Sequence, residues 1–391
     1  MLKAQSKIGT KPKTKFIFIL GTTEIGGAEK QAILLGNELV KRDSFKVVFF
    51  LFGTRKGKAA LQLEKLGISY KILKIPESHF YFLRLYRILI YILRLRLCRP
   101  TILLPYTNNP NIYTSLIWKF TGAKTCIWNQ RDEGIGLIYS GLTLKALCNV
   151  PCFIANSNGS RDFLIKKFSI PEDKIVVINN GIENKATTLD RQNWRKQYSF
   201  RNEDYIICMV ANLHKDKDHE TLIRAFNNII YKKSDQVTCD IKNFKLLLAG
   251  RYDDKYEYLY KLSEDLNLSD KIFFLNEVDS VHDLLNAVDV SVLSTFSEGL
   301  SNVAIESMLA GVPFTGTNID GILEVLGYNY KDYLANPRDD EDLASKILFF
   351  KNNPRLTDEI VRQNKKRVLS HFSLDKLYSN SLTLFLRYIQ N

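Results

Sequence analysis

The feature that most constrains the fold of this 391-residue chain is an alternation of short apolar runs with helical stretches, which begins twice. The first series opens with Lys15–Leu20, and the second opens with Tyr205–Val210. Short apolar runs that alternate with helices are typical of parallel strands in a sheet covered on both faces. The chain is therefore predicted to be an α/β protein with two doubly wound, Rossmann-like domains that face each other across a cleft.

The length agrees with two domains, because a chain of this size exceeds what one core usually supports. We expect an N-terminal domain at 1–183, a C-terminal domain at 184–372, and a closing helix at 373–391 that packs back on the first domain. Further apolar runs predict strands at 45–52, 101–104, 124–128, 152–155, 174–178, 244–249, 271–275, 288–293 and 313–316.

Positive charge is concentrated in the first hundred residues. They hold 20 Lys and Arg against 6 Asp and Glu, and the net charge of the whole chain is +13. Such an excess indicates an anionic partner for this portion, either nucleic acid or an anionic lipid surface. The six cysteines show no Cys-x-x-Cys pair and no metal-ligand spacing, which favours reduced thiols and a cytoplasmic location. Neither a signal peptide nor a membrane span is predicted.

A helix start in the segment Ser291–Glu324 carries the clearest candidate site. The helix is predicted to begin near Asn302, with Ser301 as its cap and Glu298 in the loop before it. Free backbone N–H groups at such a start, here those of 300–303, bind anions such as phosphate. An acid beside a phosphate site is favourable only if it binds neighbouring sugar hydroxyls.

A second carboxylate, Glu306, follows one turn inside the same helix. It is predicted to share an inward-pointing face with Val303 and Ala310. A buried carboxylate needs hydrogen-bond donors, and the two hydroxyls of a ribose supply them. The alternative is that Glu298 is a surface acid and that Glu306 is bonded to backbone.

Two other segments follow strands and precede helices, where a phosphate can bind. Lys217, near Lys215 in an alternating Lys-Asp run, can balance a diphosphate, although a solvated charged loop is the alternative. Gly26 and Gly27 let the backbone approach a phosphate or sugar closely. This pair is neither a complete G-x-G-x-x-G motif nor a P-loop.

Taken in chain order, these segments resemble the retaining glycosyltransferases of the GT-B fold, the large family 4, over nearly the whole chain. The most specific segment is SEGLSNVAIESMLAGVP at 297–313. The other matching segments are GGAE at 26–29, ANS at 155–157, NGIE at 180–183, VANL at 210–213 with Lys217, and LLNAVDV at 284–290.

The resemblance implies a role for each candidate residue. Glu306 is implied to bind the nucleotide ribose, Glu298 the hydroxyls of the transferred sugar, and Lys217 the leaving diphosphate. The remaining donor contacts are implied for Gly26, Gly27, Asn212, Gly299, Leu300, Ser301 and Asn302. The family implies no divalent metal and no other cofactor.

The chain departs from the family pattern at two places. Many members have an arginine where Asn212 stands, which leaves the diphosphate to Lys217, with Lys215 as a second candidate. Many also have an active-site histidine in the region of 128–134, where this chain has none. Arg131 or Asp132 is a candidate contact to acceptor or donor there, and the alternative is a structural Arg–Asp pair.

The segment 80–97, FYFLRLYRILIYILRLRL, is a second unusual feature. On a helix, Arg84, Arg87, Tyr91 and Arg94 fall on one stripe, and the rest is almost all Leu, Ile and Phe. Such a basic, aromatic-rich helix can lie in an anionic membrane interface with its arginines facing the membrane. The alternative is a core helix that packs on the first sheet with its arginines in water.

The resemblance implies a metal-independent, retaining hexosyltransferase that moves a sugar from a nucleotide-diphosphate sugar to an acceptor hydroxyl. The basic first domain favours an acceptor-side role, a lipid-linked glycan acceptor of surface polysaccharide assembly, and a peripheral position on the cytoplasmic face of the membrane. A nucleic-acid partner is not expected. The alternatives are an epimerase or phosphorylase of the same fold, and a non-enzymatic protein that binds anionic lipid or nucleic acid.

Overall fold

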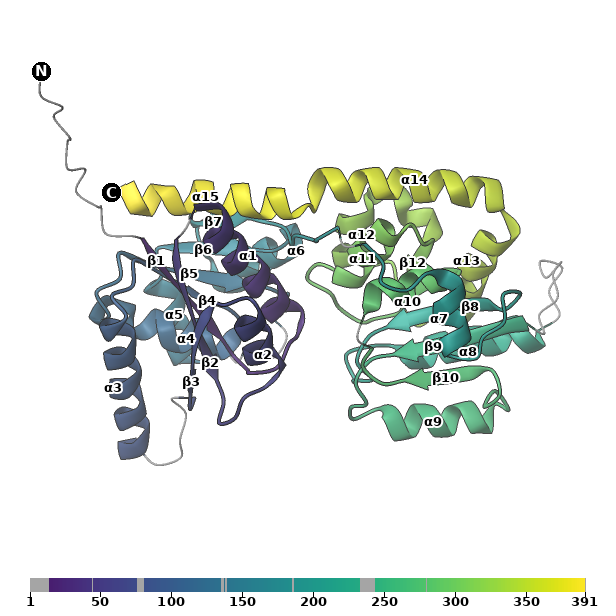
Figure 1. Cartoon of the computed structure of the whole chain (residues 1–391), viewed down its shortest axis with the longest axis horizontal. Coiled ribbons are helices and arrows are strands. Elements are labelled where there is room, and N and C mark those ends of the chain that lie inside the picture. The colour runs from purple at the N-terminus through teal and green to yellow at the C-terminus, as the bar shows by residue number, and fades with distance from the viewer. Residues whose placement is uncertain are drawn as a thin grey trace, which may run out of the picture. The chain divides into compact units, whose positions relative to one another are not determined.

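The computed structural model describes residues 14–43, 45–75, 81–134, 137, 139–184, 186–232, 243–278 and 280–390. It divides the chain into two compact units, residues 1–181 with 374–391 and residues 182–373 (Figure 1). The predicted domain boundaries, after 183 and after 372, lie within two residues of this division. Residues 1–13, which hold Lys3, Lys7, Lys11 and Lys13 of the basic first hundred residues, lie outside the described residues.

The first unit contains a seven-stranded parallel sheet. Its strands are β1 (Lys15–Leu20), β2 (Lys46–Phe52), β3 (Ser69–Leu73), β4 (Ile102–Pro105), β5 (Thr125–Gln130), β6 (Cys152–Ala155) and β7 (Ile175–Val177). Its helices are α1 (Gly27–Asp43), α2 (Lys58–Lys65), α3 (Tyr81–Leu97), α4 (Asn108–Ile117), α5 (Gly141–Cys148), α6 (Asn158–Phe168) and α15 (Leu374–Gln390).

Helices cover both faces of this sheet because the side chains of β1 alternate between two cores. Phe16 and Phe18 pack with residues of α1 and α15, while Ile17 and Ile19 pack with Tyr91 of α3 and with residues of α4. All six residues of β1 are apolar except Lys15. A run that is apolar on both sides is what a strand buried on both faces requires.

The closing helix α15 belongs to the first unit. Leu377 and Phe385 lie in the same core as β1, and Arg42 of α1 forms an ion pair with Asp375 at 2.6 Å. Gln31 of α1 exchanges two hydrogen bonds with the backbone of Gly181, at 2.8 and 3.0 Å. These contacts secure the point where the chain leaves the unit.

The second unit contains a five-stranded parallel sheet. Its strands are β8 (Tyr205–Val210), β9 (Phe244–Ala249), β10 (Ile272–Leu275), β11 (Val290–Leu293) and β12 (Phe314–Gly316). Its helices are α7 (Arg191–Gln197), α8 (His219–Tyr231), α9 (Tyr256–Asp265), α10 (Val281–Ala287), α11 (Asn302–Ala310), α12 (Asp320–Leu326), α13 (Asp340–Asn352) and α14 (Pro354–His371).

Both sheets are wound in the same order. The first runs β3-β2-β1-β4-β5-β6-β7 and the second β10-β9-β8-β11-β12, so each starts in its middle and turns outward in both directions. The winding reverses between β1 and β4 in the first unit and between β8 and β11 in the second. Ligands of doubly wound sheets bind at the carboxyl ends of such strand pairs. The predicted fold class is thus confirmed as two Rossmann-like units, and the predicted cleft between them stays a prediction.

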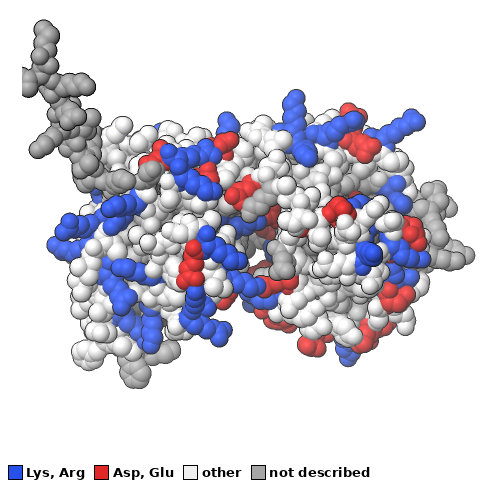
Figure 2. Space-filling model, viewed as in Figure 1, with Lys and Arg blue, Asp and Glu red and all other residues white. Residues whose placement is uncertain are grey.

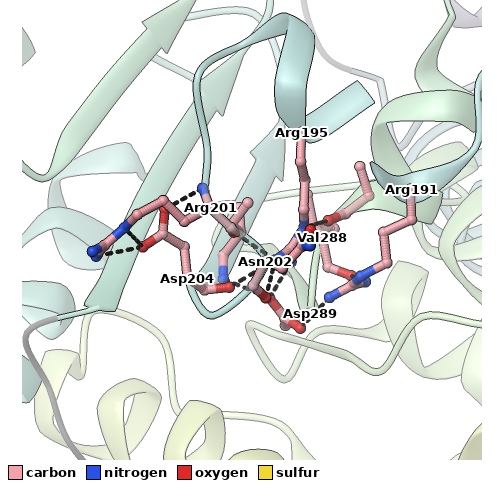
Figure 3. Close-up of polar contacts among 9 residues, drawn as sticks. Arg191, Arg195, Arg201, Asn202, Asp204, Val288 and Asp289 are labelled. Carbon is pink, nitrogen blue, oxygen red and sulfur yellow. Dashed lines mark hydrogen bonds and ion pairs between the residues drawn. The ribbon is translucent and has the colours of Figure 1, made fainter. Parts of the chain in front are cut away.

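A buried polar network holds the amino-terminal edge of the second sheet (Figure 3). The guanidinium of Arg195 is 1% exposed and donates to the carbonyls of Ala287, Asn202 and Asp204 at 2.8 to 3.0 Å. It also pairs with Asp289 at 2.8 Å, and the carboxylate of Asp289 accepts the N–H of Ile206 at 2.7 Å. Burial lowers the pKa of Arg195, and its neighbouring carboxylates oppose that shift.

Candidate functional site

Two loops leave the carboxyl-terminal edge of the second sheet at its winding reversal. The loop after β8 carries Lys217, and the loop after β11 carries Glu298. Lys217 forms an antiparallel bridge with Thr295. The hydroxyl of Ser294 donates to the carbonyl of Asp218 at 2.7 Å, and the N–H of Asp218 donates to Ser294 at 3.1 Å. The two loops are therefore held against each other by their backbones.

This pairing brings two predicted site residues together. The ammonium group of Lys217 donates to the carboxylate of Glu298, and the two side chains are 24% and 18% exposed. They are 81 positions apart in the sequence, so only the fold makes them neighbours. Because both groups stay partly open to solvent, a ligand can reach a cation and an anion at the same point.

Helix α11 begins beside this pair, as the sequence predicted. Ser301 caps it by accepting the N–H of Ala304 at 3.2 Å, and Gly311 ends it with φ 76°. The N–H of Ser301 itself donates to the carbonyl of Gly321 at 3.4 Å, so this amide already has a protein partner. Gly299 and Leu300 are buried in the loop, and Asn302 is half-buried at the helix start.

Glu306 corrects one prediction. It shares a helix face with Val303 and Ala310, but this face is the half-buried one. The core side of α11 is formed by Ala304, Ile305, Ser307, Met308 and Leu309. Since the helix is apolar on its core side, the carboxylate occupies the side left partly open, where a ligand hydroxyl can reach it.

Two glycines let the backbone come close at this edge. A Cβ at Gly321 of α12 would lie 2.0 Å from the carbonyl oxygen of Glu298. Gly250, at the end of β9, has φ 155°, and a Cβ there would lie 2.1 Å from the carbonyl oxygen of Ala211. The Glu298 loop therefore rests directly on α12. Sequence reasoning missed both positions, which carry no signal without the fold.

Asn212 has a role that the sequence did not indicate. Its side-chain oxygen accepts the N–H of Arg251 at 3.2 Å and so joins the loop after β8 to the loop after β9. Arg251 is half-exposed and paired with Asp253 at 3.0 Å. It supplies a cation at the edge where many members of the resembled family carry theirs at position 212. A charged residue two positions after the end of a predicted strand was the signal that could have identified Arg251.

A buried histidine supports the same edge. His219, the first residue of α8, is 1% exposed and lies beside the backbone of Ala211 and Lys217. Burial lowers the pKa of His219 to about 4. The imidazole is therefore neutral at pH 7 and acts as packing behind the Lys217 loop.

The carboxyl-terminal edge of the first sheet also gathers polar residues at its winding reversal. Gly26 and Gly27 are exposed at the start of α1, and the carboxylate of Glu29 accepts the N–H of Gly26 at 3.1 Å. Glu29 is 6% exposed, and burial raises its pKa although Arg131 opposes the shift. The hydrogen bond from Gly26 to Glu29 thus fixes the end of the loop that follows β1.

Arg131 and Asp132 have different partners in this edge. The guanidinium of Arg131 donates to the side chain of Asn180 and lies 5.4 Å from the ring centre of Tyr106. Its Nε has no hydrogen-bond partner within the described part of the chain. Burial lowers the pKa of Arg131 and raises that of Tyr106 to about 12. Asp132 instead accepts the N–H of Gly134 at 2.8 Å and shapes its own loop.

A strained residue completes this edge. Thr107, two residues after the end of β4, has φ 68°, which is unusual for a β-branched side chain. A Cβ at Gly21 would lie 2.6 Å from its hydroxyl, so glycine is needed where β1 ends beside it. Strain of this kind concentrates at functional positions.

The three arginines predicted to face a membrane lie on α3, but not on its outermost side. Arg84 and Arg87 are half-buried and Arg94 is exposed. Tyr91, on the same stripe, is 3% exposed and packs in the core. One side of α3 packs in the core of the first unit, as the core-helix alternative requires, while large apolar side chains face out on the other side. No helix within the described residues is both long and apolar enough to cross a bilayer.

Two protein families match consecutive parts of the chain. "Glycosyltransferase Family 4" matches residues 25–185, and "Glycosyl transferases group 1" matches residues 190–367. Together they reach from the loop after β1 into α14 and so include both carboxyl-terminal edges.

Individual relatives agree with the families. The chain is 27% identical over 230 residues to "Capsular polysaccharide biosynthesis glycosyltransferase CapM" of Staphylococcus aureus, covering 56% of this chain and 57% of the relative. It is 22% identical over 271 residues to "UDP-Gal:alpha-D-GlcNAc-diphosphoundecaprenol alpha-1,3-galactosyltransferase" of Escherichia coli, covering 67% of each. The chain spans 54% to 59% of the length of the first three curated relatives.

A solved structure matches both units. The crystal structure of Anabaena Alr3699/HepE in complex with UDP and glucose superposes with a TM-score of 0.83 at 18% identity, and covers 96% of this chain and 100% of that chain. Likeness at this identity shows the fold alone.

Proposed function

Since this chain belongs to the glycosyltransferases of the GT-B fold, we propose that it moves a hexosyl group from a nucleoside diphosphate sugar to an acceptor hydroxyl and retains the anomeric configuration. The observation that carries the proposal is the pairing of Lys217 with Glu298 beside the capped start of α11. A cation, helix-start amides and a sugar-binding acid are the groups that a nucleoside diphosphate sugar requires.

The chemistry needs a group that stabilises the leaving diphosphate. Negative charge develops on the phosphate as the glycosidic bond breaks, and Lys217 with the amides at the start of α11 stabilises it. Glu298 accepts hydrogen bonds from hydroxyls of the transferred sugar, and Glu306 accepts them from the ribose. The proton of the acceptor hydroxyl passes to the leaving phosphate, so no side chain has to form a covalent intermediate.

No metal ion or other cofactor is needed for this route. A divalent cation would neutralise a diphosphate, but Lys217 and the α11 start do so here, and Arg251 adds a cation at the same edge. Turnover is therefore expected to continue in excess chelator. Loss of activity with chelator and recovery with Mg²⁺ or Mn²⁺ would contradict this part of the proposal.

The first unit is proposed to bind the acceptor. Arg131 is a half-buried cation whose Nε has no hydrogen-bond partner in the described part of the chain, which favours an anionic group on the ligand of this edge. A lipid-linked glycan carries such a group in its diphosphate. The Escherichia coli relative is named for a diphosphoundecaprenol acceptor. The enzyme is then expected to work at the cytoplasmic face of the membrane as a peripheral protein, in the assembly of a surface glycan.

A panel of nucleoside diphosphate sugars tests the proposal. The purified chain is incubated with each donor, with and without a short-chain polyprenyl diphosphate glycan, and release of the nucleoside diphosphate is measured. We expect one donor to release its nucleoside diphosphate only when the acceptor is present. When the bond at the anomeric carbon of that donor is axial, we expect NMR to show an axial glycosidic bond in the product. An inverted product would exclude retention, and an epimerised donor without acceptor would identify an epimerase instead.

A further inference from the structure

The solvent-facing side of α3 is apolar along its whole length. Phe82 is 85% exposed, and four residues at the following helical positions are 52% to 71% exposed: Tyr86, Leu89, Leu93 and Leu97. Their spacing of three or four residues places them on one stripe, which extends about 22 Å along the helix. We call these five residues the α3 stripe.

The orientation of α3 is fixed by its opposite side. Tyr91 and Leu95 are 3% and 0% exposed in the core of the first unit. The hydroxyl of Tyr91 shares a hydrogen bond of 2.7 Å with that of Thr114, and its ring meets Phe52 edge-on at 5.6 Å. The helix therefore cannot turn its apolar stripe inward without breaking this packing. An exposed apolar patch of this extent on a folded protein marks an interaction surface.

Basic side chains flank the α3 stripe. Arg96 lies beside it on one side and Arg94 on the other, and both are exposed. The neighbouring 3₁₀ turn, Trp118–Phe120, adds an exposed lysine and Phe120, which is 63% exposed. Figure 2 shows Lys and Arg side chains gathered on the side of the first unit where α3 lies.

The sequence of α3 and of the residues that follow it up to Arg131 contains no acid to balance these charges. Residues 78–131 hold eight Lys and Arg and no Asp or Glu. A long apolar stripe with an arginine on each side is complementary to one surface in particular, a bilayer whose headgroups are anionic. A protein partner would need acids placed along both borders of the stripe, whereas anionic lipids diffuse to wherever the cations are.

A groove beside the stripe provides a place for a headgroup. It has a volume of about 420 Å³ and lies between α3 and the edge strand β3. Lys74, Arg87 and Arg94 contribute cations to its lining, and Leu83, Tyr86 and Ile90 contribute apolar surface. Cations over apolar walls match a lipid phosphate and the first carbons of its chains.

We propose that α3 docks the protein on an anionic phospholipid bilayer, with the α3 stripe inserted at the boundary between headgroups and acyl chains. Arg94 and Arg96 then contact lipid phosphates on the two sides of the inserted stripe. The inference rests on the proposed function for its purpose, because a lipid-linked acceptor has to be met at the membrane. The docking itself depends only on the first unit.

Vesicle flotation tests the docking with the full-length chain. The vesicles contain either phosphatidylcholine alone or phosphatidylcholine with 40% phosphatidylglycerol. Wild type is expected to float with the anionic vesicles and to stay at the bottom with the neutral ones. Equal flotation with both vesicles, or none with either, would overturn the proposal.

Two variants separate the apolar and ionic contributions. Leu89→Glu with Leu93→Glu is expected to abolish flotation, because it places charges in the α3 stripe. Arg94→Glu with Arg96→Glu is expected to weaken partition at least tenfold, since each arginine near an anionic surface contributes about fivefold. The matched control is Leu61→Glu, a 46%-exposed leucine on α2, which is expected to float like wild type. Wild-type flotation of the Leu89/Leu93 variant would contradict the proposal.

The alternative occupant of the stripe is a second copy of this chain. Sedimentation equilibrium of wild type and of the Leu89/Leu93 variant decides between the two. A wild-type dimer that the variant loses, without any flotation, would overturn membrane docking.

Calorimetry of the same variants with nucleoside diphosphate sugars separates the docking proposal from the proposed function. Docking variants are expected to bind the donor normally, and wild type that floats but binds no donor would refute only the proposed function.

Discussion

The second sheet carries an ion pair at each of its edges, and the two pairs differ in how fully their side chains are bonded. At the amino-terminal edge, Arg195 is 1% exposed and its guanidinium is surrounded by carbonyls and Asp289 (Figure 3). At the carboxyl-terminal edge, Lys217 and Glu298 are 24% and 18% exposed. Arg195 donates its hydrogen bonds within the protein and therefore stabilises the fold. Lys217 stays partly exposed to solvent and can therefore exchange Glu298 for a ligand.

The largest expected effect is a loss of stability at the amino-terminal edge. Arg195→Met removes the donor from the carbonyls of Ala287 and Asp204 and takes the buried one of two arginines from Asp289, so the free energy of unfolding is expected to fall by about 3–5 kcal/mol. Urea unfolding measures it. Arg191→Met is the matched control, because this arginine pairs with the same carboxylate but is 43% exposed, and about 1 kcal/mol or less is expected. Equal losses in the two variants would contradict the contrast between buried and open pairs.

The next largest effect is a loss of turnover, and it is expected at the carboxyl-terminal edge of the second sheet. Lys217→Ala removes the cation proposed for the leaving diphosphate, so turnover is expected to fall about 10²–10³-fold. The free energy of unfolding is expected to change by about 0.5 kcal/mol or less. Steady-state kinetics and urea unfolding measure the two quantities. Lys215→Ala, an exposed lysine two positions earlier, is expected to behave like wild type, and normal turnover of Lys217→Ala would refute the assignment.

Lowering the pH is expected to reduce the free energy of unfolding through His219, which packs behind the Lys217 loop at the carboxyl-terminal edge. Burial lowers the pKa of His219 from 6.5 to about 4, so the unfolded chain binds a proton before the folded one does. This contribution to stability is complete above pH 6.5 and is lost as the pH falls towards 4, by about 3 kcal/mol in total. Urea unfolding from pH 7.5 to 4.5 should show a shallower decline for His219→Gln than for wild type. A decline equal to that of wild type would contradict this account.

The smallest effect concerns the cap of α11. Ser301→Ala removes the acceptor for the N–H of Ala304 and is expected to cost about 1 kcal/mol of stability. It should also weaken donor binding, because the helix start lies at the proposed phosphate site. Ser280→Ala removes the corresponding cap of α10 and should cost the same stability with no change in donor affinity. Urea unfolding and calorimetry with the donor provide both comparisons, and a Ser301 variant with unchanged affinity would separate the cap from the site.

The alternation of apolar runs with helices predicted both sheets, because a short run of apolar residues is typical of a strand that is buried on both faces. The run Lys15–Leu20 became β1 and Tyr205–Val210 became β8 with the predicted bounds. The segment Ser69–Leu73 was missed, because β3 lies at an edge and its polar side chains face solvent. A local apolar run does not identify such a strand, which depends on its neighbour β2.

The candidate site was only partly predictable for a similar reason. Ser301 and Gly311 carry local signals for the ends of α11, and both ends lie where the sequence placed them. The pairing of Lys217 with Glu298 depends on strand order, which no local pattern contains. The inward-pointing face predicted for Glu306 is wrong, because helical spacing identifies a shared face but not which face meets the core.

Nucleoside diphosphate binding to Glu306→Ala tests the central claim most directly. Isothermal titration calorimetry first identifies which of UDP, GDP, ADP, CDP and dTDP binds wild type most tightly. The Glu306 variant is then expected to bind that nucleotide at least about tenfold more weakly, through loss of charge-assisted hydrogen bonds to the ribose. Glu341→Ala, an exposed acid of α13 paired with Lys232, should bind like wild type. Equal affinity of the Glu306 variant and wild type would contradict a donor site at the carboxyl-terminal edge of the second sheet.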